Sequence, residues 1–210
     1  MSIYSFWSPK GGVGKSTHTI NAARHYAGKG ERVGVIDADF PQYSVKKYCD
    51  YTGDKSFGLH IFDGGSLTKF IEKYAGNYDR LYLDLPPRSS QYARELIALD
   101  GVKIIVPVIV GDLDEFALME LKELRDDATK YGITDYKLAL FLNRTVPNAT
   151  SKRVDDTKQL LDSVSLPYLK SRLVNRTTAY SNIASGRNLK DLDRKAYNEF
   201  MGLLNEVEKL

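Results

Sequence analysis

The chain has 210 residues, 42% of them hydrophobic, and this length and composition predict one domain, residues 1–210, with its own buried core. Its 30 basic and 27 acidic residues give a formal net charge of +3, which excludes a strongly basic nucleic-acid coat protein. The single cysteine, Cys49, excludes an internal disulfide, and no apolar run approaches the roughly 20 residues of a membrane span, so a cytoplasmic protein is expected.

Short apolar, β-rich runs alternate with longer segments of helical period. Strands are expected at residues 3–7, 32–37, 80–84, 103–110, 137–143 and, more briefly, 166–168. Helices are expected at residues 15–28, 66–74, 89–99, 113–131, 154–163, 178–185 and 193–209. Residues 42–65 have no clear period and are expected to form an irregular surface excursion. The alternation predicts an α/β fold of three layers, with a mostly parallel, twisted sheet between helices on both faces.

A glycine-rich motif follows the first expected strand and opens the first expected helix. Its residues are Pro9, Lys10, Gly11, Gly12, Val13, Gly14, Lys15, Ser16 and Thr17. Glycines let the backbone turn its N–H groups toward an anion, and the helix adds the positive end of its dipole. Lys15 would reach the β- and γ-phosphates, Ser16 would complete the coordination of Mg²⁺, and Thr17 would contact the α-phosphate. The motif predicts a nucleotide site; the alternative is a glycine-rich turn beside a surface lysine.

Acidic residues end two of the expected strands, at the sheet edge where ligands bind in open α/β folds. Asp37 and Asp39 close the second strand, and strand alternation places them on one face. Asp84 closes the third strand ahead of Pro86 and Pro87, which stiffen the loop that follows. The alternatives are that Asp39 caps the following turn and that Asp84 is an ordinary acid at a strand end.

Pro9 stands where the usual phosphate loop has a first glycine, and Lys10 follows it. The motif thereby resembles that of the deviant Walker A ATPases, the superfamily of ParA and MinD. The resemblance implies a P-loop NTPase fold and an Mg²⁺-dependent ATPase with Lys10, Lys15 and Asp39 as catalytic residues. Lys10 would cross a dimer interface to the partner's phosphates; the alternative is a solvated lysine beside the nucleotide.

The same resemblance assigns the carboxylates. Asp39 would position the attacking water, and the metal site would comprise Ser16, Asp37 and Asp84, the last acting through water. An inserted Phe40 departs from the family's Asp-x-Asp-Pro-Gln motif and leaves the geometry after Asp39 open.

Asn143 is the expected contact to the base. It ends the fifth expected strand beside Arg144, and an Asn-Arg pair at this place contacts adenine in MinD-like relatives. No Asn-Lys-x-Asp or Thr-Lys-x-Asp guanine signature occurs, which favours ATP. The alternative is that Asn143 only caps the strand end.

The most basic stretch of the chain is residues 170–195, which resembles the C-terminal region of small ParA partition proteins. The resemblance implies that basic side chains there bind DNA without regard to sequence, and Arg172, Arg176, Arg187 and Lys190 are the expected contacts. The alternative is a solvated charged face.

Over nearly the whole chain, the resemblance implies a plasmid-partition ATPase. ATP would drive a homodimer that binds nonspecific DNA and the nucleoid, and a ParB-like centromere-binding or adaptor protein would trigger slow hydrolysis. Whether the dimers assemble further stays open. The alternatives are a metabolic ATP-dependent enzyme on the same scaffold and a MinD-like membrane-cycling ATPase. The last expected helix carries acidic residues where lipid contact requires basic ones, so packing on the body is expected in place of a membrane partner.

Overall fold

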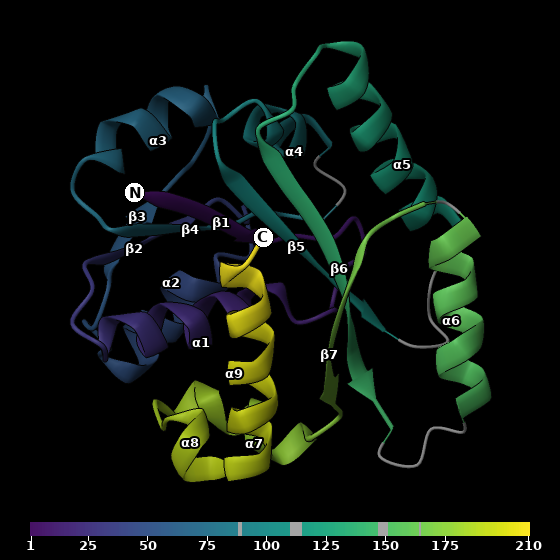
Figure 1. Cartoon of the computed structure of the whole chain (residues 1–210). Helices are drawn as coiled ribbons and strands as arrows, with labels where there is room; N and C mark the ends of the chain where they lie inside the picture. Colours follow the sequence, from purple (N-terminus) through teal and green to yellow (C-terminus); the bar gives the residue numbers. More distant parts are fainter. Residues whose placement is uncertain (88–89, 110–114, 147–150, 164) are drawn as a thin grey trace.

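The computed structural model describes residues 1–87, 90–109, 115–146, 151–163 and 165–210. Within these ranges, seven strands form one parallel sheet in the order β3-β2-β4-β1-β5-β6-β7 (Figure 1). The strands are β1 Ser2–Phe6, β2 Val33–Asp37, β3 Gly58–Ile61, β4 Arg80–Asp84, β5 Val102–Ile109, β6 Tyr136–Thr145 and β7 Tyr168–Val174.

Helices cover both faces of the sheet, as the sequence predicts. They are α1 Lys15–Ala27, α2 Ser44–Thr52, α3 Leu67–Ala75, α4 Ser90–Ile97, α5 Glu115–Lys130, α6 Ser151–Ser163, α7 Thr177–Ser181, the 3₁₀ turn Asn182–Ser185, α8 Leu189–Leu192 and α9 Arg194–Glu208. One apolar cluster joins the sheet to α3, α4, α5 and α6, and a second joins the opposite face to α1, α2, α7, α8 and α9. The α/β three-layer fold is therefore confirmed. No helix of the described ranges is long and apolar enough to cross a bilayer.

The strand order determines where the functional groups meet. β1 lies between β4 and β5, and β4 also pairs with β2 in a register that sets Asp37 directly opposite Asp84. Because all these strands run parallel, their carboxyl ends lie at one edge, where the loop after β1 also begins. Two acids that are far apart in the sequence thus lie side by side, on one side of the start of the glycine-rich loop.

The expectation of an irregular excursion at residues 42–65 is wrong. This segment contains helix α2 and edge strand β3, and Val45, Tyr48, Phe57 and Phe62 are buried. Only Val45 and Tyr48 in α2 are buried apolar residues, so the helix has a weak periodic signal.

The sixth expected strand, residues 166–168, is also displaced. β7 begins at Tyr168 and runs to Val174, past the polar residues Lys170, Ser171 and Arg172. These residues interrupt the apolar pattern because β7 is an edge strand with one side open to solvent. Val110, Ser89 and Leu113, which the sequence assigns to the ends of expected elements, lie outside the described residues.

Candidate nucleotide site

The glycine-rich loop leaves β1 and enters α1 through two residues of left-handed conformation, Gly12 at φ 73° and Gly14 at φ 92°. A Cβ atom on Gly14 would lie 3.2 Å from Nε2 of His18 and 3.4 Å from the amide nitrogen of Asn143. Gly14 is therefore required both by its backbone conformation and by the close approach of two side chains. The resulting loop curls at the N-terminus of a helix, an arrangement suited to an anion.

A cleft of about 770 Å³ opens over this loop. Its wall includes the predicted residues Gly11, Gly12, Gly14, Lys15, Ser16, Thr17 and Asp39. Val13 is buried in the loop, and Lys10 is half-buried, with its backbone N–H donating to the Ser8 hydroxyl at 3.3 Å. The structure thus places most of the predicted phosphate-binding residues around one cavity of nucleotide size, whereas Lys10 and Val13 are not among the residues that line it.

Asp84 is fully buried, close to Ser16 and Lys15 of the glycine-rich loop. Neither of its carboxylate oxygens has a hydrogen-bond partner of good geometry among the described residues. Burial raises the pKa of Asp84 to about 8, against smaller opposing effects of the nearby Ser16 hydroxyl and of Lys15. Lys15 is only 6% exposed, and burial lowers its pKa while the charges of Asp84 and Asp39 oppose that shift. A buried carboxylate without a partner is costly, and a cation bound nearby would compensate it.

This arrangement fits Mg²⁺. The described residues contain no group of three or more His, Cys, Asp or Glu side chains that could hold a metal by themselves. Mg²⁺ in nucleotide sites takes one or two protein oxygens and completes its shell with water and phosphate oxygens. Ser16, which lines the cleft, and the buried Asp84 beside it can supply those protein groups.

Asp37 has a second role that the sequence did not reveal. Its two oxygens accept hydrogen bonds from the backbone N–H groups of Asp39 at 3.2 Å and Lys46 at 2.9 Å. Lys46 lies in the first turn of α2, so Asp37 caps that helix from a neighbouring strand. Burial raises the pKa of Asp37, and the backbone hydrogen bonds oppose the shift.

The inserted Phe40 points away from the site. It is 67% exposed, and its ring contacts that of Tyr43 with centroids 5.8 Å apart. Asp39 remains buried at the cleft, where burial raises its pKa and Lys15 opposes that effect. The insertion is thus accommodated on the surface, and the acid before it stays at the cavity.

One wall of the cleft was missed by the sequence analysis. Lys47, Tyr48 and Tyr51 of α2 line it, as do Tyr180 and the 3₁₀ turn that follows. The i, i+3 spacing of Val45 and Tyr48 was the available signal for α2, and two apolar positions in nine residues did not suffice.

A second cavity of about 340 Å³ adjoins the first and shares Gly14, Thr17 and Arg144 with it. Asn143 lines this second cavity, and its amide nitrogen donates to the Val13 carbonyl at 2.8 Å and to Nε2 of His18 at 3.1 Å. Its amide oxygen accepts from the backbone N–H of Arg144 at 3.0 Å, and Arg144 has a positive φ of 52°. Strained residues of this kind concentrate at binding sites, and the cavity has room for a planar base.

The four expected DNA contacts do not share one environment. Arg172, Arg187 and Lys190 are exposed. Arg176 instead pairs with Glu199 at 2.8 Å and with Asp193 at 3.6 Å, and its side chain is largely covered. The structure therefore separates Arg176, whose charge is compensated, from the three solvent-facing cations.

The chain is similar to known proteins in part of a family model, in sequence and in fold. The family model described as "ParA: NUBPL iron-transfer P-loop NTPase" matches residues 1–60. Maintenance of carboxysome distribution protein A from Halothiobacillus neapolitanus is 27% identical over 204 residues, which cover 94% of this chain and 92% of that protein. An iron-sulfur cluster carrier protein from Mycobacterium bovis is 31% identical over 121 residues, which cover 43% of this chain and 32% of the carrier. Among solved structures, an ATP complex of McdA from Cyanothece has a TM-score of 0.75 at 16% identity and covers 100% of this chain and 97% of that one, a likeness of fold.

Proposed function

We propose that the chain is a positioning ATPase of the ParA/MinD superfamily and that its ATP-bound homodimer binds DNA without regard to sequence; the match of residues 1–60 to the ParA family model and the full-length likeness to a carboxysome distribution protein support this. One observation carries the proposal: Lys15 and Ser16 line a cleft of nucleotide size, and the carboxylate of Asp84, without a hydrogen-bond partner of good geometry among the described residues, is buried close to both. These groups match the charges of a nucleotide with its magnesium ion.

Each residue of the site has a task in this proposal. The loop from Lys10 to Thr17 holds the phosphates, and Lys15 offsets their charge. Ser16 and Asp84 hold Mg²⁺, with Asp37 close by, and the ion would neutralise charge on the β- and γ-phosphates when bound. Asp39, at the cleft wall, orients the water that attacks the γ-phosphate. Asn143 contacts adenine from the second cavity.

Lys10 makes the cycle depend on a second copy of the chain. Reaching the partner's phosphates would make ATP part of the dimer interface, so ATP would stabilise the dimer by linkage. Two protomers present two DNA-binding surfaces at once, and the resulting avidity turns weak contacts into useful affinity. Hydrolysis, stimulated by a ParB-like or other adaptor protein, then releases the DNA.

The cargo is a large body reached through that adaptor. The Halothiobacillus relative, named for carboxysome distribution, aligns over nearly the whole chain, which supports a positioning role. The proposed cargo is a plasmid or other DNA, and the same ATP cycle would serve a protein cargo.

The test is binding to a random-sequence DNA duplex with ATP, with ADP and without nucleotide, at several salt concentrations. We expect binding only with ATP, falling steeply with salt, and its loss in Lys10→Ala. Lys69 is an exposed residue of α3, on the sheet face opposite α1 and α2. Lys69→Ala is therefore the matched control and should bind like the wild type. Binding that ignores the nucleotide, or none under any condition, would refute the DNA-carrier cycle.

Two other functions on this scaffold are less well supported. An iron-sulfur carrier holds its cluster through cysteines, but Cys49 is the single cysteine of the chain, half-buried, with its pKa raised to about 11 by burial. A MinD-like membrane cycle remains compatible with the superfamily, and liposome sedimentation with ATP distinguishes it from DNA binding.

A further inference from the structure

His18 is a buried histidine that the proposed ATPase cycle does not use. It lies in α1 one turn after Lys15 and is 2% exposed. The rings of Phe6, Phe141 and Phe200 surround it at centroid distances of 5.4 to 5.8 Å, and Tyr180 lies at 6.2 Å. An apolar side chain would fill this aromatic pocket at lower cost, so the imidazole requires an explanation.

The hydrogen bonds of Asn143 supply that explanation. An amide nitrogen has two hydrogens and no acceptor. One hydrogen goes to the Val13 carbonyl at 2.8 Å and the other to Nε2 of His18 at 3.1 Å. The amide oxygen accepts from the backbone N–H of Arg144 at 3.0 Å and keeps a second acceptor site. That acceptor site is the one hydrogen-bonding position that Asn143 can still offer to a ligand.

The opposite orientation of the amide is excluded by two of these neighbours. It would turn the oxygen toward the Val13 carbonyl, which can only accept, and the nitrogen toward the Arg144 N–H, which can only donate. With the amide so oriented, its second hydrogen faces Nε2 of His18, and this ring nitrogen must be the acceptor. The second ring nitrogen of His18, Nδ1, has no hydrogen-bond partner in the described part of the chain. Within the described residues, the one polar contact of the imidazole is therefore its acceptance of the Asn143 N–H.

We propose that His18 is a positioning residue for base selection, which holds the Asn143 amide so that only its oxygen can meet the base. Asn143 and His18 line the 340 Å³ cavity beside the phosphate cleft. Adenine carries a donor amino group at the position where guanine carries an acceptor carbonyl. An acceptor in the site can accept a hydrogen bond from the adenine amino group but repels the guanine carbonyl. A buried polar mismatch of this kind discriminates strongly between two ligands. This inference rests on the proposed nucleotide site and adds the residue that sets its preference for ATP.

The test measures competition of ATP and GTP against a fluorescent ATP analogue in the full chain. His18→Phe keeps a ring in the aromatic pocket and removes the acceptor. We expect it to reduce the preference for ATP over GTP about tenfold, the loss of roughly one buried hydrogen bond. His18→Gln, whose amide oxygen can replace Nε2 as acceptor, should restore the preference to near the wild-type value. His25→Phe is the matched control, because His25 lies in the same helix but lines neither nucleotide cavity.

The ratio of the two affinities separates positioning from simple structural support. If His18→Phe weakens ATP and GTP equally, or leaves both unchanged, the inference is overturned while the ATPase proposal stands. If the wild-type chain binds neither nucleotide, both are overturned. Thermal melting establishes that each variant is folded, and His18→Met, which fills the pocket with a flexible apolar chain, replaces a phenylalanine variant that does not fold.

Discussion

At the scale of single residues, Asp84 shows how a functional group can work against the stability of the fold. The carboxyl is fully buried, and its pKa is raised to about 8, from an ordinary value of about 3.9. Since the folded-state pKa lies above the unfolded one, the folded protein binds more protons between these two values. The contribution of protonated Asp84 to the stability of the folded state is thus complete below about pH 4, and it is lost as the pH rises toward 8.

Asp84→Asn should therefore stabilise the nucleotide-free protein at pH 8. Removing the charge should gain about 1–3 kcal/mol after the cost of burying an amide, which corresponds to about 2–4 °C in Tm for each kcal/mol in a chain of this size. The loss of stability between pH 4 and 8 should also become smaller. Thermal denaturation of both proteins as a function of pH checks this.

Asp79→Asn is the matched control, and its effect on stability at pH 8 should have the opposite sign. Hydrogen bonds from Arg32 lower the pKa of Asp79 to about 2, so its ionised form favours the folded state and its loss should destabilise the protein at pH 8. An Asp84→Asn protein no more stable than the wild type at pH 8 would show that the carboxylate is compensated in solution.

The sequence could identify the residues whose role follows from a motif of neighbouring residues. The glycine-rich run and the strand-ending acids Asp37 and Asp84 lie where the pattern predicts, because strand periodicity and turn chemistry act over a few neighbours. His18 was not identified, because its partner Asn143 is 125 positions away and one histidine in a helix produces no pattern.

At the scale of elements, the final helix α9 packs on the body of the protein, and its acidic residues contact the neighbouring strand β7. Phe200, Leu203, Leu204 and Val207 are buried in the cluster shared with α1 and the sheet, which confirms the expectation that this helix packs on the body. The packing of α9 also explains why the sequence did not predict the full length of β7. This edge strand is stabilised by side chains of α9 in addition to its pairing with β6. No local pattern in residues 166–174 contains that information.

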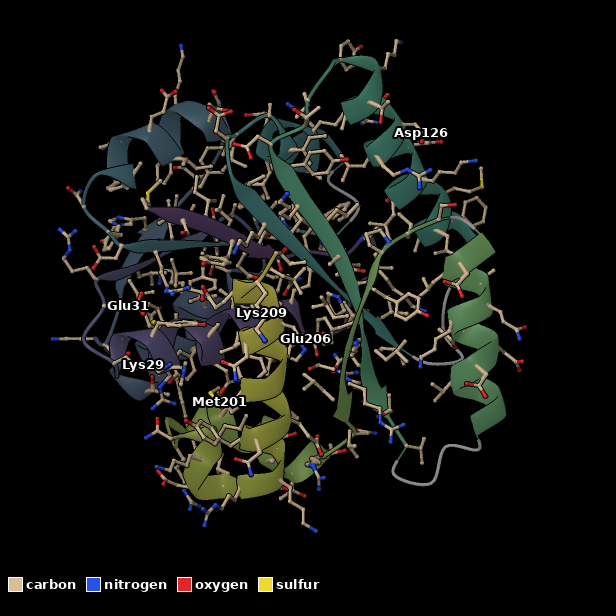
Figure 2. The ribbon with its side chains drawn as sticks, viewed as in Figure 1. Lys29, Glu31, Asp126, Met201, Glu206 and Lys209 are labelled. Atoms are coloured by element: carbon tan, nitrogen blue, oxygen red, sulfur yellow. The ribbon has the colours of Figure 1, made fainter. Side chains whose placement is uncertain are left out.

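Glu206 is the acid that contacts β7 most extensively. Figure 2 shows it on α9 beside that strand, and its oxygens accept from the backbone N–H groups of Lys170 at 2.7 Å and Ser171 at 2.8 Å. The exposed polar groups of an edge strand are thereby covered by a charged side chain, which also disfavours pairing with another sheet.

Glu206→Ala should destabilise the protein by about 1–2 kcal/mol, because these charge-assisted hydrogen bonds are replaced by contacts to water. Denaturant unfolding measures the change. Asn205→Ala, the exposed neighbour on the same helix, should stay within about 0.5 kcal/mol of the wild type. Equal effects of the two substitutions would mean that helix propensity, and not the contact with β7, is responsible.

At the scale of the whole molecule, the position of the charges matters more than the net charge of +3. Arg187 and Lys190 are exposed in the segment between α7 and α9, and Lys190 shares a hollow of about 290 Å³ with Lys29 at the end of α1. Arg176, by contrast, is engaged by Glu199 and Asp193. If the ATP-bound dimer binds DNA, we expect the DNA phosphates to contact Arg187 and Lys190, whose charges face solvent.

The double variant Arg187→Ala/Lys190→Ala should therefore weaken ATP-dependent DNA binding and reduce its salt dependence. Each lost phosphate contact lowers the slope of log K against log salt by about 0.9, so two contacts in each protomer of a dimer lower it by about 2–4. Lys69→Ala/Lys122→Ala removes the same charge from exposed positions on the helices of the opposite sheet face and should leave the slope unchanged. Arg176→Ala should lower stability and leave the slope at the wild-type value, since its charge is already paired. A slope reduced by Arg176→Ala, and not by the double variant, would instead place the DNA along the C-terminal end of β7.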